Sequence, residues 1–256
     1  MKFSANLGFL WKDLPLPDAI RAAKAAGFDA VECHWPYDVP EADVIAALSE
    51  TGLPMLGINT VRGNVEAGDN GLLALPGRAA EARAAIDQAV SYAAAIGAGA
   101  IHAMAGFADG ATAQACFIAN ITYACDQAAA HDITILIEPL NQYDAPGYFL
   151  KNTAHAVEII SEVGKSNLKL MFDFYHVQLI EGDITNRLTR LLPHIGHIQF
   201  AAAPGRGAPG QGEIAFEPLF RHVASLGYDR PLGAEYKTNG PTEDTLGWLQ
   251  SAKAIT

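Results

Sequence analysis

The chain has 256 residues, of which 50% are hydrophobic and 18% are charged. A chain this apolar can bury enough surface to offset the entropy lost on ordering, so its composition excludes a disordered protein and predicts a folded globular one. Its 17 Lys and Arg residues against 28 Asp and Glu residues give a net charge of −11. This excess of negative charge argues against nucleic acid or an anionic membrane surface as a partner.

Three features of the sequence bear on where the protein is located. The first residues lack the sustained apolar core of a signal peptide, and no run of 18 apolar residues predicts a membrane span. Cys33, Cys116 and Cys125 show no CxxC spacing, which favours buried, reduced thiols. We therefore expect a cytoplasmic protein.

Short apolar runs typical of strands recur along the chain, and each is followed by a helical pattern. The expected strands are residues 3–7, 30–34, 56–60, 100–104, 133–139, 168–174, 195–200 and 232–236. The expected helices are residues 16–26, 41–50, 77–96, 113–131, 154–163, 177–192, 216–225 and 243–254. Proline and glycine mark several helix ends, such as Pro15 before the first helix and Gly52 after the second.

Eight strand–helix units predict an α/β protein whose parallel sheet closes into a single (β/α)8 TIM barrel, residues 1–256, with the active site at the C-terminal rim of the strands. A doubly wound open sheet is the main alternative. It is disfavoured because no G-x-G-x-x-G motif follows the first strand and no Walker A motif is present.

Polar side chains end four consecutive expected strands. They are Glu138, Asp173, Gln199 and Glu235. Because a barrel interior is packed with apolar layers, groups that end its strands are expected to face one common rim. His197 lies one layer deeper than Gln199 and is expected to be a core histidine, whereas His176, three residues after Asp173, suits contact with a substrate.

Three carboxylates at one rim would repel one another unless a cation lies between them. The four ligands offer oxygen only, so they favour a hard divalent cation, Mg²⁺ or Mn²⁺, although the sequence leaves open whether the metal is obligatory.

Several segments together resemble the hydroxypyruvate isomerase family of xylose isomerase-like TIM barrels. The matching segments, in chain order, are Phe3-Ser4-Ala5-Asn6-Leu7, Val31-Glu32 with Pro36-Tyr37-Asp38, Ile137-Glu138-Pro139-Leu140-Asn141, Asp173-Phe174-Tyr175-His176, Gly196-His197-Ile198-Gln199, Pro204-Gly205-Arg206, Pro209-Gly210 with Gly212-Glu213-Ile214, and Glu235-Tyr236-Lys237. The resemblance extends from residue 3 to about residue 250.

The resemblance implies an aldose–ketose type isomerase that acts on a small hydroxy-oxo acid. Glu138 and Glu235 would be the paired proton donor and acceptor, and with Asp173 and Gln199 they would hold the metal. His176 and Arg206 would contact the substrate.

An anionic substrate needs a cationic partner, and Arg206 is the natural one for a carboxylate. Further candidates for substrate contact are Lys237 as a second cation, Glu213 as an acid or a loop anchor, and Glu32 and His102 at strand ends. Asn6 and Asn59 also end strands and are weaker candidates for contact with hydroxyl groups.

The sequence departs from the family pattern at Ala201-Ala202-Ala203, where relatives usually carry Ala-Asp-Asn before Pro-Gly-Arg. This leaves the exact substrate open. Hydroxypyruvate and tartronate semialdehyde are the expected pair, and the alternatives are a 2-oxo-tetronate isomerase, a ketose 3-epimerase or a non-catalytic sugar-acid binding protein. A multi-zinc barrel endonuclease is disfavoured by the negative charge and by the few histidines at strand ends. A homodimer is among the open oligomeric states.

Overall fold

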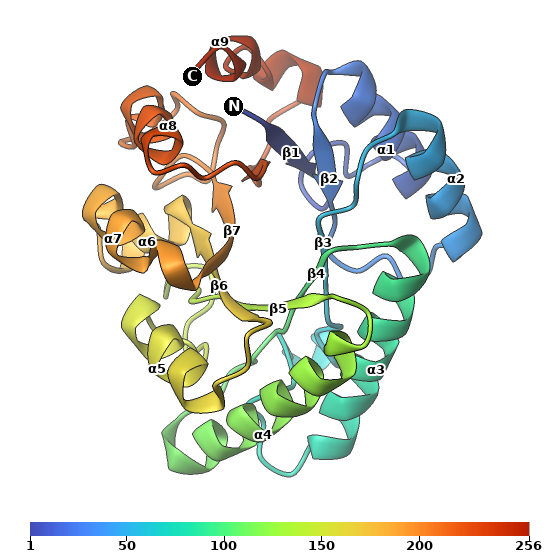
Figure 1. Ribbon diagram of the computed structural model, residues 1–256, viewed down its shortest axis with the longest axis vertical. Coiled ribbons are helices and arrows are strands. Elements are labelled where there is room, and N and C mark those ends of the chain that lie inside the picture. The colour runs from blue at the N-terminus through green and yellow to red at the C-terminus, as the bar shows by residue number, and fades with distance from the viewer. Residues whose placement is uncertain (256) are drawn as a thin grey trace. The chain divides into compact units, whose positions relative to one another are not determined.

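The computed structural model describes residues 1–255 and has eight parallel strands that alternate with helices along the chain (Figure 1). The strands are β1 (Phe3–Asn6), β2 (Ala30–Glu32), β3 (Gly57–Asn59), β4 (Ala100–His102), β5 (Thr134–Ile137), β6 (Leu168–Asp173), β7 (Ile195–Phe200) and β8 (Leu232–Ala234). They form one sheet in the order β2-β1-β8-β7-β6-β5-β4-β3. A parallel bridge from Val31 to Met55, two residues before β3, joins the two ends of this order. The predicted (β/α)8 barrel class is therefore confirmed.

The helices follow the predicted pattern at most positions. They are α1 (Leu16–Ala25), α2 (Glu41–Thr51), α3 (Ala79–Ile96), α4 (Gly110–Ala129), α5 (Thr153–Val163), α6 (Phe174–Ile180), α7 (Ile184–Leu191), α8 (Phe216–Ser225) and α9 (Leu249–Lys253), with 3₁₀ turns η1 (Val65–Ala67), η2 (Leu192–His194) and η3 (Thr242–Thr245). Gly52 and Gly97 end α2 and α3 in the left-handed conformation that glycine adopts without steric cost.

Two expected helices are each divided in two, so the prediction was wrong there. Residues 177–192 form α6 and α7, because Gly182 and Asp183 both have positive φ angles, 62° and 52°, which interrupt a right-handed helix. Residues 243–254 form the turn η3 and the short helix α9.

The described chain forms two compact units, and the first comprises residues 1–56, 172–193 and 197–255. Within it β1 pairs in parallel with both β2 and β8. The core packs rings edge to face: Phe3 lies 5.3 Å from Phe220 on α8 and 5.2 Å from Trp248 beside α9, between ring centroids. Such pairs add to the free energy gained by burial alone, so they fix α8 and α9 against β1.

The second unit comprises residues 57–171 and 194–196. Its helices α3 and α4 pack against each other (Figure 1), and α3 buries a row of alanines that lets its neighbours approach closely. The loop after β3 meets the loop after β4 through two glycines with positive φ. A Cβ on Gly71 would lie 2.6 Å from the nitrogen of Gly106, so neither position can hold a larger residue without a shift in the backbone.

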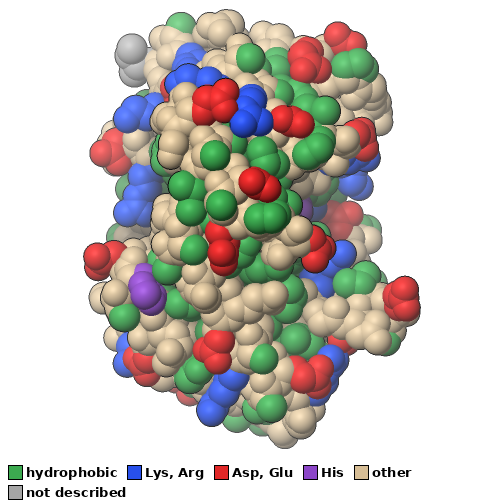
Figure 2. Space-filling model, turned by 90° about the vertical axis from the view of Figure 1, so that its right-hand side faces the viewer, with side chains coloured by type: hydrophobic (Ala, Val, Ile, Leu, Met, Phe, Trp, Pro, Cys, Tyr) green, Lys and Arg blue, Asp and Glu red, His purple; other side chains and the backbone are tan. Residues whose placement is uncertain are grey.

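Acidic and basic side chains are interspersed with apolar ones on the face drawn in Figure 2. Charged side chains pair at the surface, as Arg21 does with both Asp18 and Glu50. No helix within residues 1–255 is both long enough and apolar enough to cross a membrane.

Candidate active site

Glu235 follows β8 directly and is 6% exposed. Its Oε1 accepts a hydrogen bond from Asn6 Nδ2 at 2.8 Å and lies 2.9 Å from His34 Nε2, while its Oε2 accepts from Arg206 Nη2 at 2.5 Å. Burial acts to raise the pKa of Glu235, but Arg206 and His34 outweigh it and lower that pKa to about 2. Glu235 is therefore an ionised, buried carboxylate at neutral pH, as a general base must be.

Arg206 lies in the loop after β7 and is held by its backbone and by its guanidinium. Its φ of 54° is in the left-handed region, and its carbonyl oxygen accepts a hydrogen bond from the Lys237 nitrogen at 2.7 Å. The guanidinium lies over two rings, 4.7 Å from the centroid of Phe9 and 4.9 Å from that of Tyr175. These contacts hold a planar cation suited to a carboxylate in a fixed orientation.

Asp173 ends β6 and caps α6, since its Oδ1 accepts a hydrogen bond from the Tyr175 nitrogen at 2.9 Å. Its Oδ2 is buried and makes no hydrogen bond among residues 1–255; it lies 3.7 Å from Arg206 Nη2 and 3.8 Å from His176 Nε2. Burial raises the pKa of Asp173 to about 7, although Arg206 acts to lower it. One carboxylate oxygen is therefore left for a ligand.

Glu32, at the end of β2, accepts three hydrogen bonds from buried neighbours. Ser4 Oγ donates to its Oε1 at 2.9 Å, and Gln199 Nε2 (2.9 Å) and His197 Nε2 (3.0 Å) bond its Oε2. Gln199 Oε1 is buried and has no hydrogen-bond partner within the described chain. His197 thus has the structural partner expected of a core histidine.

In the second unit, Glu138 and His102 lie together at neighbouring strand ends. Glu138 follows β5, His102 ends β4, and their Oε2 and Nδ1 atoms are 3.7 Å apart. Each is 4% exposed. A buried carboxylate with an imidazole beside it is a chemically competent proton-transfer group.

Two predicted site residues lie at the surface. Lys237 is exposed. Glu213 is also exposed, and its Oε1 accepts a hydrogen bond from Gln178 Nε2 at 3.0 Å, which is the geometry of a loop anchor.

His34, Phe9 and Tyr175 also contact Glu235 or Arg206, and their contacts were not predicted from the sequence. His34 was the last residue of an expected strand, and a titratable side chain at a strand end was the available signal. The two rings carried no such signal, because a ring that stacks on Arg206 has the same sequence pattern as a ring in the core.

The segment Ala201-Ala202-Ala203 is fully buried. Its loop is anchored through the backbone instead of through a polar side chain: the Ala202 nitrogen donates to the Gly207 oxygen, and the Glu213 nitrogen donates to the Ala203 oxygen.

Asp173 and His176, both buried in the first unit, are side chains of the kinds that hold metal ions. The donor set fits a hard divalent cation, and Asp173 Oδ2 and Gln199 Oε1 are buried acceptors that no hydrogen bond uses. Such unpaired buried oxygens are costly unless a ligand occupies them.

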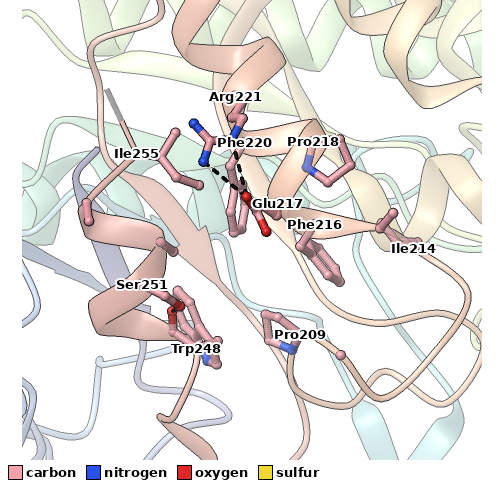
Figure 3. A pocket seen from close by; sticks show the side chains of 14 residues that line it. Pro209, Ile214, Phe216, Glu217, Pro218, Phe220, Arg221, Trp248, Ser251 and Ile255 are labelled. Atoms are coloured by element: carbon pink, nitrogen blue, oxygen red, sulfur yellow. Dashed lines mark hydrogen bonds and ion pairs between the residues drawn. The ribbon is translucent and has the colours of Figure 1, made fainter.

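A separate cavity of about 650 Å³ lies in the first unit among α8, α9 and the loop after β7 (Figure 3). Its walls are mainly apolar and include Pro209, Phe216 and Trp248. The only opposite charges among its lining residues, Glu217 and Arg221, pair with each other at 3.0 Å. This cavity therefore lacks the acid–base groups of the candidate site.

Residues 20–252 match the family model described as xylose isomerase-like TIM barrel. The chain belongs to the xylose isomerase-like TIM barrel family. It is 42% identical to the 2-oxo-tetronate isomerase of Cupriavidus necator, over 97% of each chain, and 36% identical to the hydroxypyruvate isomerase of Escherichia coli, over 97% of this chain and 98% of that one. A crystal structure described as an AP endonuclease, family 2, from Brucella melitensis superposes with a TM-score of 0.94 at 35% identity and covers 98% of each chain.

Membership of the xylose isomerase-like family agrees with the chemistry of the strand ends. The curated relatives that match along nearly the whole chain are named as isomerases. This chain is an isomerase as well.

Proposed function

We propose that this enzyme isomerises a small hydroxy-oxo acid, hydroxypyruvate to tartronate semialdehyde, by proton transfer through an enediolate. The observation that carries the proposal is the pair formed by Glu235 and Arg206. A buried carboxylate that is ionised at neutral pH lies against a guanidinium that also lies over two aromatic rings. The first can accept a proton from carbon, and the second can bind the carboxylate of the substrate.

The reaction moves a carbonyl group by one carbon. A base removes a proton from C3 of hydroxypyruvate, the electron pair forms the C2–C3 double bond of an enediolate, and a proton is then added to C2 while the hydroxyl proton moves from O3 to O2. Glu138 and Glu235 follow the fifth and eighth strands, and in a (β/α)8 barrel both strand ends belong to the catalytic face. We assign the paired acid and base to these two residues.

We assign the metal site to Glu138, Asp173, Gln199 and Glu235, with Mg²⁺ or Mn²⁺ as the ion. A divalent cation bound there supplies Lewis-acid stabilisation of the enediolate oxygen. Support comes from Asp173 and Gln199, each of which has one buried oxygen without a hydrogen bond among the described residues. His176, 3.8 Å from Asp173, supports the same site from the substrate side.

Substrate contacts are assigned to Arg206 first, with His176 and His102 as hydrogen-bonding groups. Arg206 binds the carboxylate that both members of the substrate pair carry. Lys237, Glu213 and Glu32 remain predictions: the first two are exposed, and Glu32 already accepts three hydrogen bonds.

A 2-oxo-tetronate isomerase is the second candidate, because the relative with that name shares 42% of its residues with this chain. The two activities differ by one carbon of the acid and use the same proton transfer. The site residues described above suit either substrate.

The test is a panel of C3 and C4 oxo acids and ketohexoses, assayed with and without chelator in ²H₂O. We expect turnover of a C3 or C4 oxo acid with deuterium incorporated at carbon, and no turnover of ketohexoses.

Glu138→Gln and Glu235→Gln should each lower kcat by about 10²–10⁴-fold with the fold intact. Glu217→Gln is the matched control, since Glu217 is exposed and its ion pair within residues 1–255 is with Arg221 at the surface. Full activity in both site variants would contradict the assignment.

A further inference from the structure

The geometry points to Glu32 as a positioning residue that fixes the side-chain amide of Gln199 so that its oxygen is the atom available to a cation. This inference deepens the proposed function, because it takes the cation site of the isomerase as the site that Gln199 serves. It also gives Glu32 a role other than substrate contact.

The strand register makes room for this contact. Ser4 on β1 and Gln199 on β7 both pair with Gly233 on β8, so the three residues occupy matching positions on adjacent strands. Gly233 has no side chain, and a Cβ there would lie 2.2 Å from Glu32 Oε1 and 2.8 Å from Gln199 Cγ. The space above Gly233 is thus what allows a carboxylate from β2 to reach an amide on β7.

The chemistry of the pair then fixes the orientation of the amide. An ionised carboxylate can only accept hydrogen bonds, whereas an amide has one face that donates and one that accepts. Glu32 Oε2 takes the Nε2 hydrogen of Gln199 at 2.9 Å and lies 3.0 Å from His197 Nε2. A flipped amide would place its oxygen against this carboxylate, so the flip is disfavoured.

This orientation of the amide determines the surroundings of its oxygen, Gln199 Oε1. Gln199 is 3% exposed, and its Oε1 has no hydrogen-bond partner in the described chain. An unpaired buried acceptor held in one orientation is available to a cation, while the reversed amide would present hydrogens that repel one. Glu32 therefore determines that position 199 offers an acceptor.

The test exchanges the carboxylate at position 32 and the amide at position 199. In Gln199→Glu, two carboxylates meet, and the melting temperature measured with chelator should fall by about 5 °C or more. In the double variant Glu32→Gln/Gln199→Glu, the new amide donates to the new carboxylate, so most of that loss should be recovered. Mn²⁺ titration followed by electron paramagnetic resonance should then show the double variant binding Mn²⁺ about 10-fold more tightly than the wild type, because its free oxygen is now anionic.

The control is Ser4→Ala, which removes a hydrogen bond from the other oxygen of Glu32 and should leave Mn²⁺ affinity at the wild-type value. Melting temperatures that simply add in the double variant, or a Mn²⁺ affinity that does not respond to position 199, would overturn the inference. Recovery of stability and tighter Mn²⁺ binding in an enzyme that fails to turn over any oxo acid would uphold the positioning role and reject the proposed function.

Discussion

Arg206 and Glu235 form a largely buried ion pair in which Nη2 and Oε2 are 2.5 Å apart, although one residue lies in the loop after β7 and the other follows β8. The pair leaves Glu235 ionised: burial alone would raise its pKa, and the guanidinium, with His34, brings it down to about 2. The same contact therefore neutralises the buried charge and keeps the carboxylate ionised at neutral pH.

Arg206→Met should raise the pKa of Glu235, because burial remains and the guanidinium is removed. In the wild type the lowered pKa contributes stability that is complete above about pH 4.5 and is lost as the pH falls toward 2. The stability difference between wild type and variant should accordingly be largest at neutral pH and shrink in acid, as measured by urea unfolding at pH 7 and pH 3. The acid limb of the kcat/KM profile should move to higher pH.

The matched control for Arg206→Met is Arg221→Met, in which an exposed arginine loses its exposed partner Glu217. It should change stability by less than about 1 kcal/mol at either pH. An unchanged acid limb in Arg206→Met would show that the guanidinium does not set the ionisation of Glu235.

Asp173→Asn should stabilise the protein at pH 8. The folded-state pKa of Asp173 is raised to about 7 from an ordinary value of 3.8, so the wild type loses stability as the pH rises between these values. The variant lacks this loss and keeps the cap on α6, because an amide oxygen can also accept from the Tyr175 nitrogen. The gain should be on the order of 2 kcal/mol at pH 8 and near zero at pH 4, measured by urea unfolding with chelator present. A gain that is equal at both pH values would contradict the raised pKa.

Gly8→Ala should disturb the site through His34. A Cβ on Gly8 would lie 2.2 Å from His34 Nδ1, so the ring must move away from Glu235, with which its Nε2 now pairs at 2.9 Å. We expect a loss of stability of about 1–3 kcal/mol and a lower kcat/KM. The control is Gly247→Ala, where an added Cβ meets no atom within 4 Å.

A second substitution separates the two effects of Gly8→Ala. Removing the ring in Gly8→Ala/His34→Ala should restore much of the stability, since the clash is gone, but should leave kcat/KM low because Glu235 still lacks its imidazole. Recovery of both quantities would show that His34 has no part in the reaction.

Thiol labelling should distinguish the three cysteines. Cys33 is 6% exposed and Cys125 is 1% exposed, and burial raises the pKa of each thiol to about 12. Because the thiolate is the reactive form, both should resist Ellman's reagent in the native protein at pH 8. Cys116 is partly exposed, so one thiol should react natively and three after denaturation. Three rapidly reacting thiols in the native protein would contradict the packing around β2 and α4.

The strands and the site differ in how far the sequence could predict them. β7 and α8 have the predicted bounds, because apolar runs and the residues that end them are local signals. The split between α6 and α7 was missed, since it depends on the left-handed backbone at Gly182 and Asp183 and on the early start that Asp173 gives to α6. A glycine inside a helical pattern does not by itself reveal such a break.

The strand-end positions of Glu138, Asp173 and Glu235 were predictable, because an apolar run that stops at a carboxylate is a local signal. The role of His34 was not, because its ring approaches Glu235 only where Gly8 leaves room. Lys237 was predicted to contact the substrate because of its positive charge, but its side chain is exposed. Its backbone nitrogen instead donates a hydrogen bond to the Arg206 carbonyl oxygen.

Arg206 is thus fastened twice to the same short stretch of chain, through its carbonyl oxygen to residue 237 and through its guanidinium to residue 235. Segment 208–211 of the same loop lies outside both attachments. Substitutions in that segment, which borders the separate apolar cavity, can therefore be made while the cation and its carboxylate keep their spacing.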